Sequence, residues 1–128
     1  DGYSFSRNIK EHTSAKIFVV GSILFSNLQS FPIKLRKYKN NENININNLF
    51  YRYVRWDRLK TSNKIKKLIT NDKKLNWIEK SDFFCKFKIE ECYLIEDGQP
   101  KIYDNAHLTI NTYDKYAAFL IKHLNEDL

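Results

Sequence analysis

Two short apolar runs decide the fold: IFVVG at residues 17–21 and LNWI at residues 75–78. The first run is continuous and β-branched, without alternation, which is typical of a central strand in a parallel sheet that is covered on both faces. The second run is a short apolar burst that suits a parallel neighbour. Residues 49–70 between them have the apolar spacing of a helix, with a polar middle at residues 57–63 that predicts a bend or a break.

Helical patterns flank this unit at both ends of the chain. Residues 1–13 are amphipathic, and apolar side chains mark one face of a final helix at Tyr113, Ala117, Leu120, Ile121 and Leu124. Residues 31–48 contain Pro32 and are expected to be irregular, and the Asp-Gly pair within residues 96–100 predicts a chain reversal. This order of elements predicts an α/β fold in a single domain that spans residues 1–128, with three layers in which helices flank a flavodoxin-like parallel sheet.

Composition limits the classes of protein to which the chain can belong. Hydrophobic residues make up 42% of the 128 residues and aromatic residues 15%, which is too much for a disordered tail. No apolar run reaches the ~18 residues of a membrane-spanning helix. The net charge of +7 comes largely from residues 34–39 and 52–74. We interpret these stretches as a solvated basic face and expect no nucleic-acid partner; a site for a polyanion, an anionic membrane or a glycan is the alternative.

The segment YDNAHLT, residues 103–109, is the most informative for chemistry. Asp104 precedes His107 by three residues, and a short turn lets two side chains at this spacing touch. A carboxylate against one imidazole nitrogen fixes the tautomer, and it stabilises the imidazolium that forms when the other nitrogen takes a proton from a serine. The pair is therefore a candidate general base for acyl chemistry. On spacing alone, a surface or capping role for His107 is the alternative.

The two cysteines, Cys85 and Cys92, leave two interpretations open. They are either separate buried thiols or a disulfide that closes a short loop in an oxidising compartment. We expect no zinc site, because the four close cysteine or histidine ligands of such a site are missing from the neighbouring sequence.

The stretch from Cys85 to the final helix resembles the end of an SGNH domain. It is most similar to the SGNH domains fused behind the membrane acyltransferase module of bacterial O-acyltransferases. Those domains commonly end with two cysteines, a turn that contains Gly, a Tyr-x-Asp-x-x-His-Leu-Ser/Thr motif and a last helix. In this chain Tyr103 adjoins Asp104 directly, which is a common form of the motif. The positions that fit this pattern are Cys85, Cys92, Tyr103, Asp104, His107, Leu108 and Thr109.

The family's Gly-Asp-Ser, Gly and Asn blocks are not found in this chain. No nucleophile or oxyanion donor is therefore assigned, and we expect the chain to be the C-terminal half of an SGNH domain whose N-terminal half precedes Asp1. The run IFVVGS at residues 17–22 resembles the strand that follows the family's Asn block.

The resemblance implies acyl transfer, for example of acetyl groups, to hydroxyls of a cell-surface glycan, or ester hydrolysis there. His107 would shuttle the proton of a serine, and Asp104 would orient His107, without a cofactor or a metal. The acyl donor would be delivered by a membrane acyltransferase module. The site would lie at the periplasmic or extracytoplasmic face of a bacterial inner membrane, as part of a membrane-anchored parent, which agrees with a Cys85–Cys92 disulfide.

Three other residues are candidate substrate contacts. Arg52 and Arg55, followed by Arg58, recur every three residues and would share a helix face suited to an anionic glycan. Tyr103 adjoins the Asp–His pair. Two other functions stay open: a non-catalytic basic module that binds glycan or nucleic acid, and a degenerate SGNH-like domain used only for docking.

Overall fold

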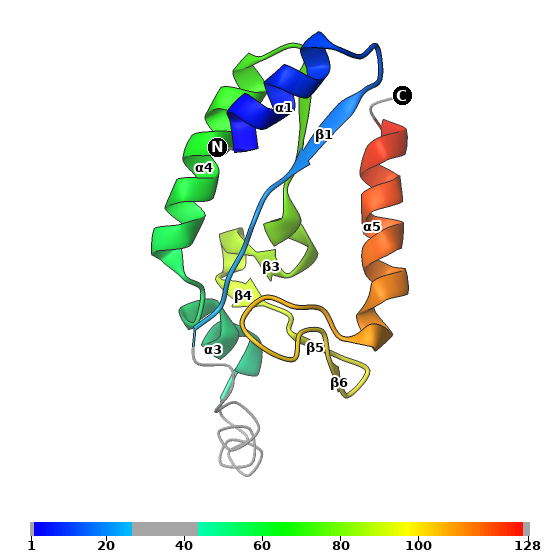
Figure 1. Ribbon diagram of the computed structural model, residues 1–128. Helices are drawn as coiled ribbons and strands as arrows, with labels where there is room; N and C mark the ends of the chain where they lie inside the picture. Colours follow the sequence, from blue (N-terminus) through cyan, green and yellow to red (C-terminus); the bar gives the residue numbers. More distant parts are fainter. Residues whose placement is uncertain (1, 27–43, 127–128) are drawn as a thin grey trace.

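The computed structural model describes residues 2–26 and 44–126, and it is mixed α/β (Figure 1). Its described part holds one two-stranded parallel sheet and two short antiparallel strand pairs. Most of the region that we expected to be irregular, residues 31–48, lies outside the described residues. Its last part differs from the prediction, because residues 46–48 already belong to a helix.

The two apolar runs form the parallel pair that the sequence predicts. Strand β1 (Ile17–Val20) pairs with β2 (Leu75–Ile78), in a register that places Val20 opposite Ile78. The Gly21 N–H extends the ladder and donates to the Ile78 carbonyl over 2.8 Å. Backbone N–H and C=O groups alternate in direction along a strand. The N–H and C=O groups of Phe18 and Val20 therefore point to the edge of β1 that faces away from β2.

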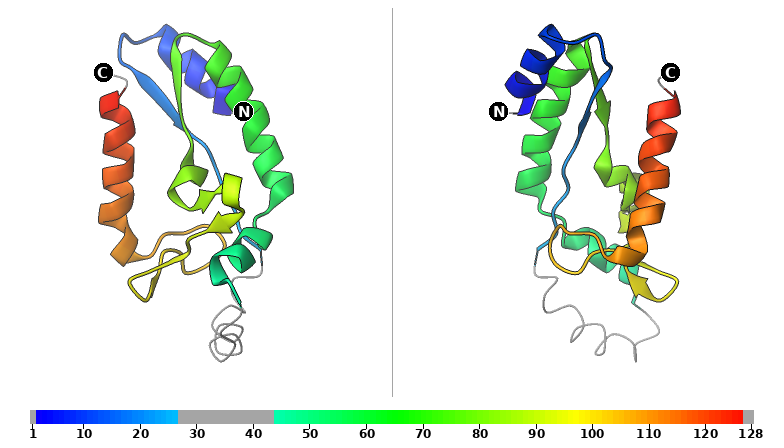
Figure 2. Two further views of the ribbon diagram at one scale, coloured as in Figure 1. Left: turned by 180° about the vertical axis from the view of Figure 1, so that it is seen from behind. Right: turned by 45° about the vertical axis from the view of Figure 1, so that its right-hand side comes forward.

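Helices lie on both sides of this strand pair. α1 (Gly2–Glu11) and α4 (Trp56–Asn71) lie on one side, and α5 (Tyr113–Glu126) stands on the other, as the views in Figures 1 and 2 agree. α4 buries Leu59 and Ile69 against the rest of the fold. α5 has no fully buried residue, so one side of the sheet is packed more closely than the other.

The single helix predicted at residues 49–70 is in fact two helices. α3 (Ile46–Arg52) is followed by a short break, and α4 then begins at Trp56. The break falls at residues 53–55 and not within residues 57–63. Val54 leaves the helix to form a bridge with Phe25, and the Arg55 N–H donates to the Leu24 carbonyl at 2.8 Å. A tertiary contact therefore ends the helix at a place that the local sequence does not mark.

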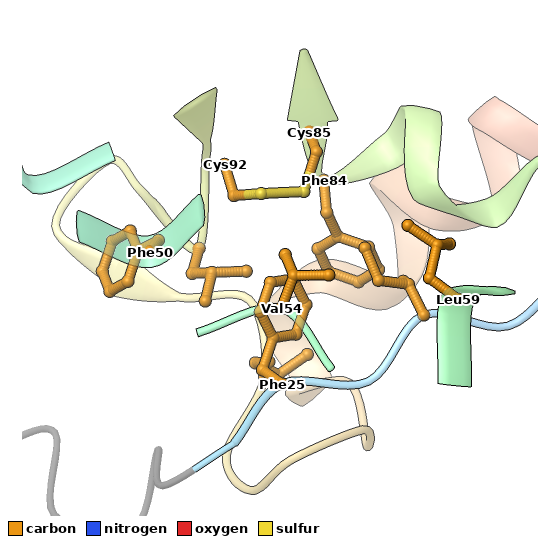
Figure 3. Packing of buried hydrophobic residues seen from close by; sticks show 10 residues of the cluster. Phe25, Phe50, Val54, Leu59, Phe84, Cys85 and Cys92 are labelled. Atoms are coloured by element: carbon orange, nitrogen blue, oxygen red, sulfur yellow. A yellow bond between two sulfur atoms is a disulfide. The ribbon is translucent and has the colours of Figure 1, made fainter. Parts of the chain in front are cut away.

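A disulfide hairpin organises the core of the second half of the chain. β3 (Cys85–Lys86) pairs antiparallel with β4 (Glu91–Cys92), and η3 (Phe87–Ile89) lies in the connection. Cys85 and Cys92 are opposite each other and form a disulfide. Figure 3 shows this bridge inside a cluster of buried side chains that includes Phe25, Phe50, Val54, Leu59 and Phe84. The cluster joins the chain after β1, the two middle helices and the hairpin in one core.

The Asp-Gly reversal is confirmed as a second hairpin. β5 (Ile95–Glu96) and β6 (Gln99–Pro100) are antiparallel, and the two residues between them have positive φ, 51° at Asp97 and 73° at Gly98. Lys115 of α5 reaches this hairpin and lies 3.1 Å from a carboxylate oxygen of Glu96 and 3.1 Å from one of Asp97.

The face of α5 that packs is not the face that we predicted. Tyr116 and Phe119 contact Phe83 of η2 (Lys80–Phe83), with ring centroids 5.1 and 5.4 Å apart. Tyr113 and Ile121 of the predicted inward face are each 55% exposed. α5 carries apolar residues on both sides, and the position of Phe83 decides which side is covered. η4 (Ile110–Thr112) leads directly into this helix.

Candidate active site

The Asp–His pair lies in a closed loop, residues 101–109. At the base of the loop, the Thr109 N–H donates to the Lys101 carbonyl at 2.9 Å. Nearer the tip, the Tyr103 N–H donates to the His107 carbonyl at 3.1 Å. Two backbone hydrogen bonds between its two arms therefore close the loop.

Apolar residues fix this loop to the core at the end of the molecule toward which β1 runs. Ile102 and Leu108 bridge each other, Ile102 is buried, and Leu108 packs against the core cluster. The chain continues from β1 to Phe25, whose N–H donates to the Asn105 carbonyl at 3.0 Å. The tip of the loop therefore lies beyond the carboxyl end of β1, where ligand sites of parallel α/β sheets are found.

Both carboxylate oxygens of Asp104 are used inside the loop. Oδ1 accepts from the N–H groups of Ala106 at 2.8 Å and of His107 at 2.7 Å. Oδ2 lies 2.6 Å from Nδ1 of the His107 ring. An ionised carboxylate can only accept, so Nδ1 carries the proton, and Nε2 is the basic nitrogen of the neutral ring. The structure brings the two side chains together, as their spacing predicts.

These donors lower the pKa of Asp104. The backbone N–H of His107 contributes most, followed by the N–H of Ala106 and then the imidazole, and together they lower the pKa of the carboxyl to about 2. Hydrogen bonds to the charged form of an acid favour that form. Asp104 is thus ionised at neutral pH.

The imidazole is held and remains accessible. The His107 side chain is 71% exposed. The Tyr103 ring stacks on it, with centroids 5.7 Å apart and an angle of 18° between the planes. Tyr103 covers one face of the imidazole, and none of the described residues is hydrogen-bonded to Nε2.

No protein-family model, curated protein or solved structure matches this chain.

A nucleophile is not found beside the pair within residues 2–26 and 44–126. In these ranges no serine or threonine hydroxyl is hydrogen-bonded to His107. Thr109 is nearest in sequence, but its hydroxyl donates to the Pro100 carbonyl at 2.6 Å and lies 3.0 Å from the Thr112 hydroxyl. Its role is to close the base of the loop.

The arginines do not share a helix face, so that prediction is wrong. Arg52 ends α3, and its Nη2 donates to Oδ1 of Asn48 at 3.4 Å. Arg55 precedes α4 and binds both carboxylate oxygens of Asp57, at 3.0 and 2.8 Å. Arg58 lies 3.8 Å from the same carboxylate. The break between α3 and α4 separates these side chains. A substrate contact by Arg52 or Arg55 stays a prediction.

The pairing of Cys85 with Cys92 resolves the choice that the sequence left open. Their Cα atoms lie 4.0 Å apart, and such a bridge fits an oxidising compartment outside the cytosol. Over the described ranges, no group of three or more His, Cys, Asp or Glu side chains could hold a metal ion. The described helices are also all too short or too polar to cross a membrane.

The backbone donors of the site were not predicted from the sequence. The N–H groups of His107 and Ala106 lower the pKa of Asp104 more than the imidazole does. The signal was present, because an Asp followed by turn residues commonly accepts from N–H groups two and three positions later.

Proposed function

We propose that this chain provides the acid–base pair of an SGNH-type serine hydrolase or acyltransferase. The observation that carries the proposal is the 2.6 Å contact between Asp104 Oδ2 and His107 Nδ1, in a ring that is 71% exposed. This arrangement leaves Nε2 basic, oriented and accessible, which a general base for a hydroxyl requires.

In the proposed reaction, a serine hydroxyl attacks the carbonyl carbon of an ester. Nε2 of His107 takes the hydroxyl proton as the new C–O bond forms, and it then gives this proton to the departing alcohol oxygen. In the second half, water or an acceptor hydroxyl attacks the acyl-serine, and His107 again accepts and returns the proton. Asp104 stays ionised throughout and balances the charge of the imidazolium between the two transfers.

The serine and the oxyanion donors are proposed to come from outside the described residues, in a larger three-layer, flavodoxin-like parallel sheet. Two features support this extension. The outer edge of β1 presents the backbone groups of Phe18 and Val20, and the Val20 side chain is 41% exposed. α5 leaves Tyr113 and Ile121 uncovered on the opposite side of the sheet. Parallel strands seldom occur as an isolated pair with such open surfaces.

We further propose that the acceptor is a cell-surface glycan, with the acyl group delivered by a membrane acyltransferase module. The disulfide supports an extracytoplasmic location, at the periplasmic face of a bacterial membrane. The resemblance of residues 85–124 to SGNH domains of bacterial O-acyltransferases supports the substrate class.

The first test uses the chain itself. Two-bond nitrogen–proton correlation spectra of the His107 ring should show the tautomer with the proton on Nδ1, and Asp104→Asn should shift the population toward the other tautomer, because the amide can donate to Nδ1. His123→Ala is a matched control that should leave the His107 signals unchanged. A His107 ring protonated on Nε2 in the unmodified chain would remove the basis of the proposal.

The second test concerns catalysis. In a protein that joins this chain to a Gly-Asp-Ser segment, His107→Ala should lower hydrolysis of p-nitrophenyl acetate by about 10³-fold or more, because the serine loses its base. His123→Ala again serves as the control. Unchanged hydrolysis in the His107→Ala protein would favour the docking-only alternative.

A further inference from the structure

One side of α4 carries an uncompensated row of positive charge. The charges are those of Lys60, Lys64 and Lys67. Together with Trp56, which precedes them on the same side of the helix, we call these residues the α4 stripe. These residues stand at i, i+4, i+8 and i+11, so they fall within about 80° of the helix circumference. All four are exposed. The stripe extends about 16 Å along the helix.

The lysines of the stripe have no acidic partner in the described part of the chain. Asp57 is the one carboxylate within α4, and it is already bound by Arg55 at 2.8 Å and lies 3.8 Å from Arg58. None of the three stripe lysines forms an ion pair with a described residue. Like charges three and four positions apart repel each other and weaken a helix. A bound polyanion would remove this repulsion.

An aromatic ring begins the stripe. Trp56 is 39% exposed, and its ring is held edge-on by Tyr51 and Phe87, with centroids 5.0 and 6.0 Å away. A fixed ring beside cations offers an apolar face for stacking next to donors for acidic groups. Sugar rings with carboxylates present both kinds of group at once.

The stripe begins near the Asp–His loop. The Arg55 N–H, one residue before α4, donates to the Leu24 carbonyl, and the next residue of that segment, Phe25, donates to the Asn105 carbonyl of the loop. Figures 1 and 2 place the start of α4 and the loop at the same end of the molecule. The first turn of α4, where the stripe begins, therefore lies near the loop that carries His107.

We propose that the α4 stripe binds a polysaccharide with carboxylate groups, and that this polymer is the acyl acceptor. This inference rests on the proposed function for the role of the polymer as acceptor, but the binding itself does not require catalysis. The disulfide disfavours nucleic acid as the occupant, because it fits a compartment outside the cytosol. A membrane surface is disfavoured because the apolar face of α4, with Leu59 and Ile69, is buried in the fold.

The test measures binding of polygalacturonate to the full chain by isothermal titration calorimetry, with dextran as the neutral glycan. The variant K60Q/K64Q/K67Q removes the stripe charges. The variant K88Q/K115Q/K122Q removes three lysine charges elsewhere, so both have the same net charge. We expect polygalacturonate to bind, dextran not to bind, and the stripe variant to lose about tenfold or more in affinity, against less than about threefold for the control. Trp56→Ala should weaken binding several-fold.

Four results would overturn the inference. The first is that polygalacturonate does not bind, and the second is equal losses in the two triple variants, which would indicate net charge alone. The third is dextran binding as tight as polygalacturonate, and the fourth is tighter binding of an oligothymidylate at matched charge and salt. The His107 tautomer measurement separates this inference from the proposed function. The stripe variant should keep the proton on Nδ1, so a failure of glycan binding leaves the acid–base pair intact. Loss of the tautomer with intact binding would instead overturn the acid–base proposal.

Discussion

The acid titration of Asp104 tests the construction of the loop most directly. In the folded chain three hydrogen-bond donors lower the pKa of this carboxyl from 3.8 to about 2, and the backbone N–H of His107 contributes most to the shift. At pH 3 a carboxyl with a pKa of about 2 is about 9% protonated, whereas one with a pKa of 3.8 is about 86% protonated. Carbon-13 NMR of the labelled side-chain carboxyl should therefore show Asp104 still largely ionised at pH 3.

The sign of the effect on stability follows from the direction of the shift. Because the folded-state pKa lies below the unfolded value, the native loop favours the carboxylate. The stabilisation is fully present above about pH 4 and is lost as the pH falls toward 2. The Ala106 N–H donates a hydrogen bond to the Asp104 carboxylate, so faster hydrogen exchange of this amide should report the loss locally.

A comparison with His107→Ala identifies which donors lower the pKa. This substitution removes the imidazole and keeps both backbone N–H groups, so the pKa of Asp104 should remain clearly below 3.8. A titration midpoint near 3.8 in the unmodified chain would refute the reasoning, and so would a return to 3.8 in the variant. The second result would mean that the ring, and not the backbone, holds the carboxylate.

Three further predictions concern the frame around the loop. Reduction of the Cys85–Cys92 disulfide should lower the free energy of unfolding by about 2.5 kcal/mol, because the unfolded chain gains the entropy of the short loop that the bridge closes. Urea titrations with and without dithiothreitol measure this change. A C85A/C92A chain should not respond to the reductant. Phe84→Ala should cost about 3–5 kcal/mol, because the ring is 2% exposed in the core cluster, and a loss below 1 kcal/mol in urea would contradict that packing. Gly21→Ala should cost about 1–3 kcal/mol, because its Cβ would lie 2.5 Å from Cζ2 of Trp77, and an unchanged melting temperature would show that the ring moves freely.

The parts of the fold that could be predicted are those that short-range sequence determines. The β-branched run of β1 and the apolar run of β2 have one conformation that suits them, and their parallel pairing is confirmed. The Asp97-Gly98 reversal depends on two residues that adopt positive φ, and it is also confirmed. The Asp104–His107 contact belongs to the same class, because it forms within four consecutive residues.

The parts that could not be predicted depend on contacts between distant segments. The break before α4 exists because Val54 pairs with Phe25, 29 positions earlier in the chain, and no local residue type announces it. The packed face of α5 is selected by Phe83, while the helix offers apolar residues on both sides. The prediction that the arginines share one helix face failed for the same reason. It assumed one helix, whereas tertiary contacts divide this segment into two.

The closure of the loop by its own backbone also affects the order in which a site can assemble. Contacts between residues close in sequence form in far less time than those that join distant segments, because little chain entropy is lost. The Tyr103–His107 hydrogen bond and the Asp104–His107 contact span four and three positions. The His107 imidazole can thus be oriented early in folding, before distant segments pack. A serine from another segment would then pack against an imidazole that is already in position.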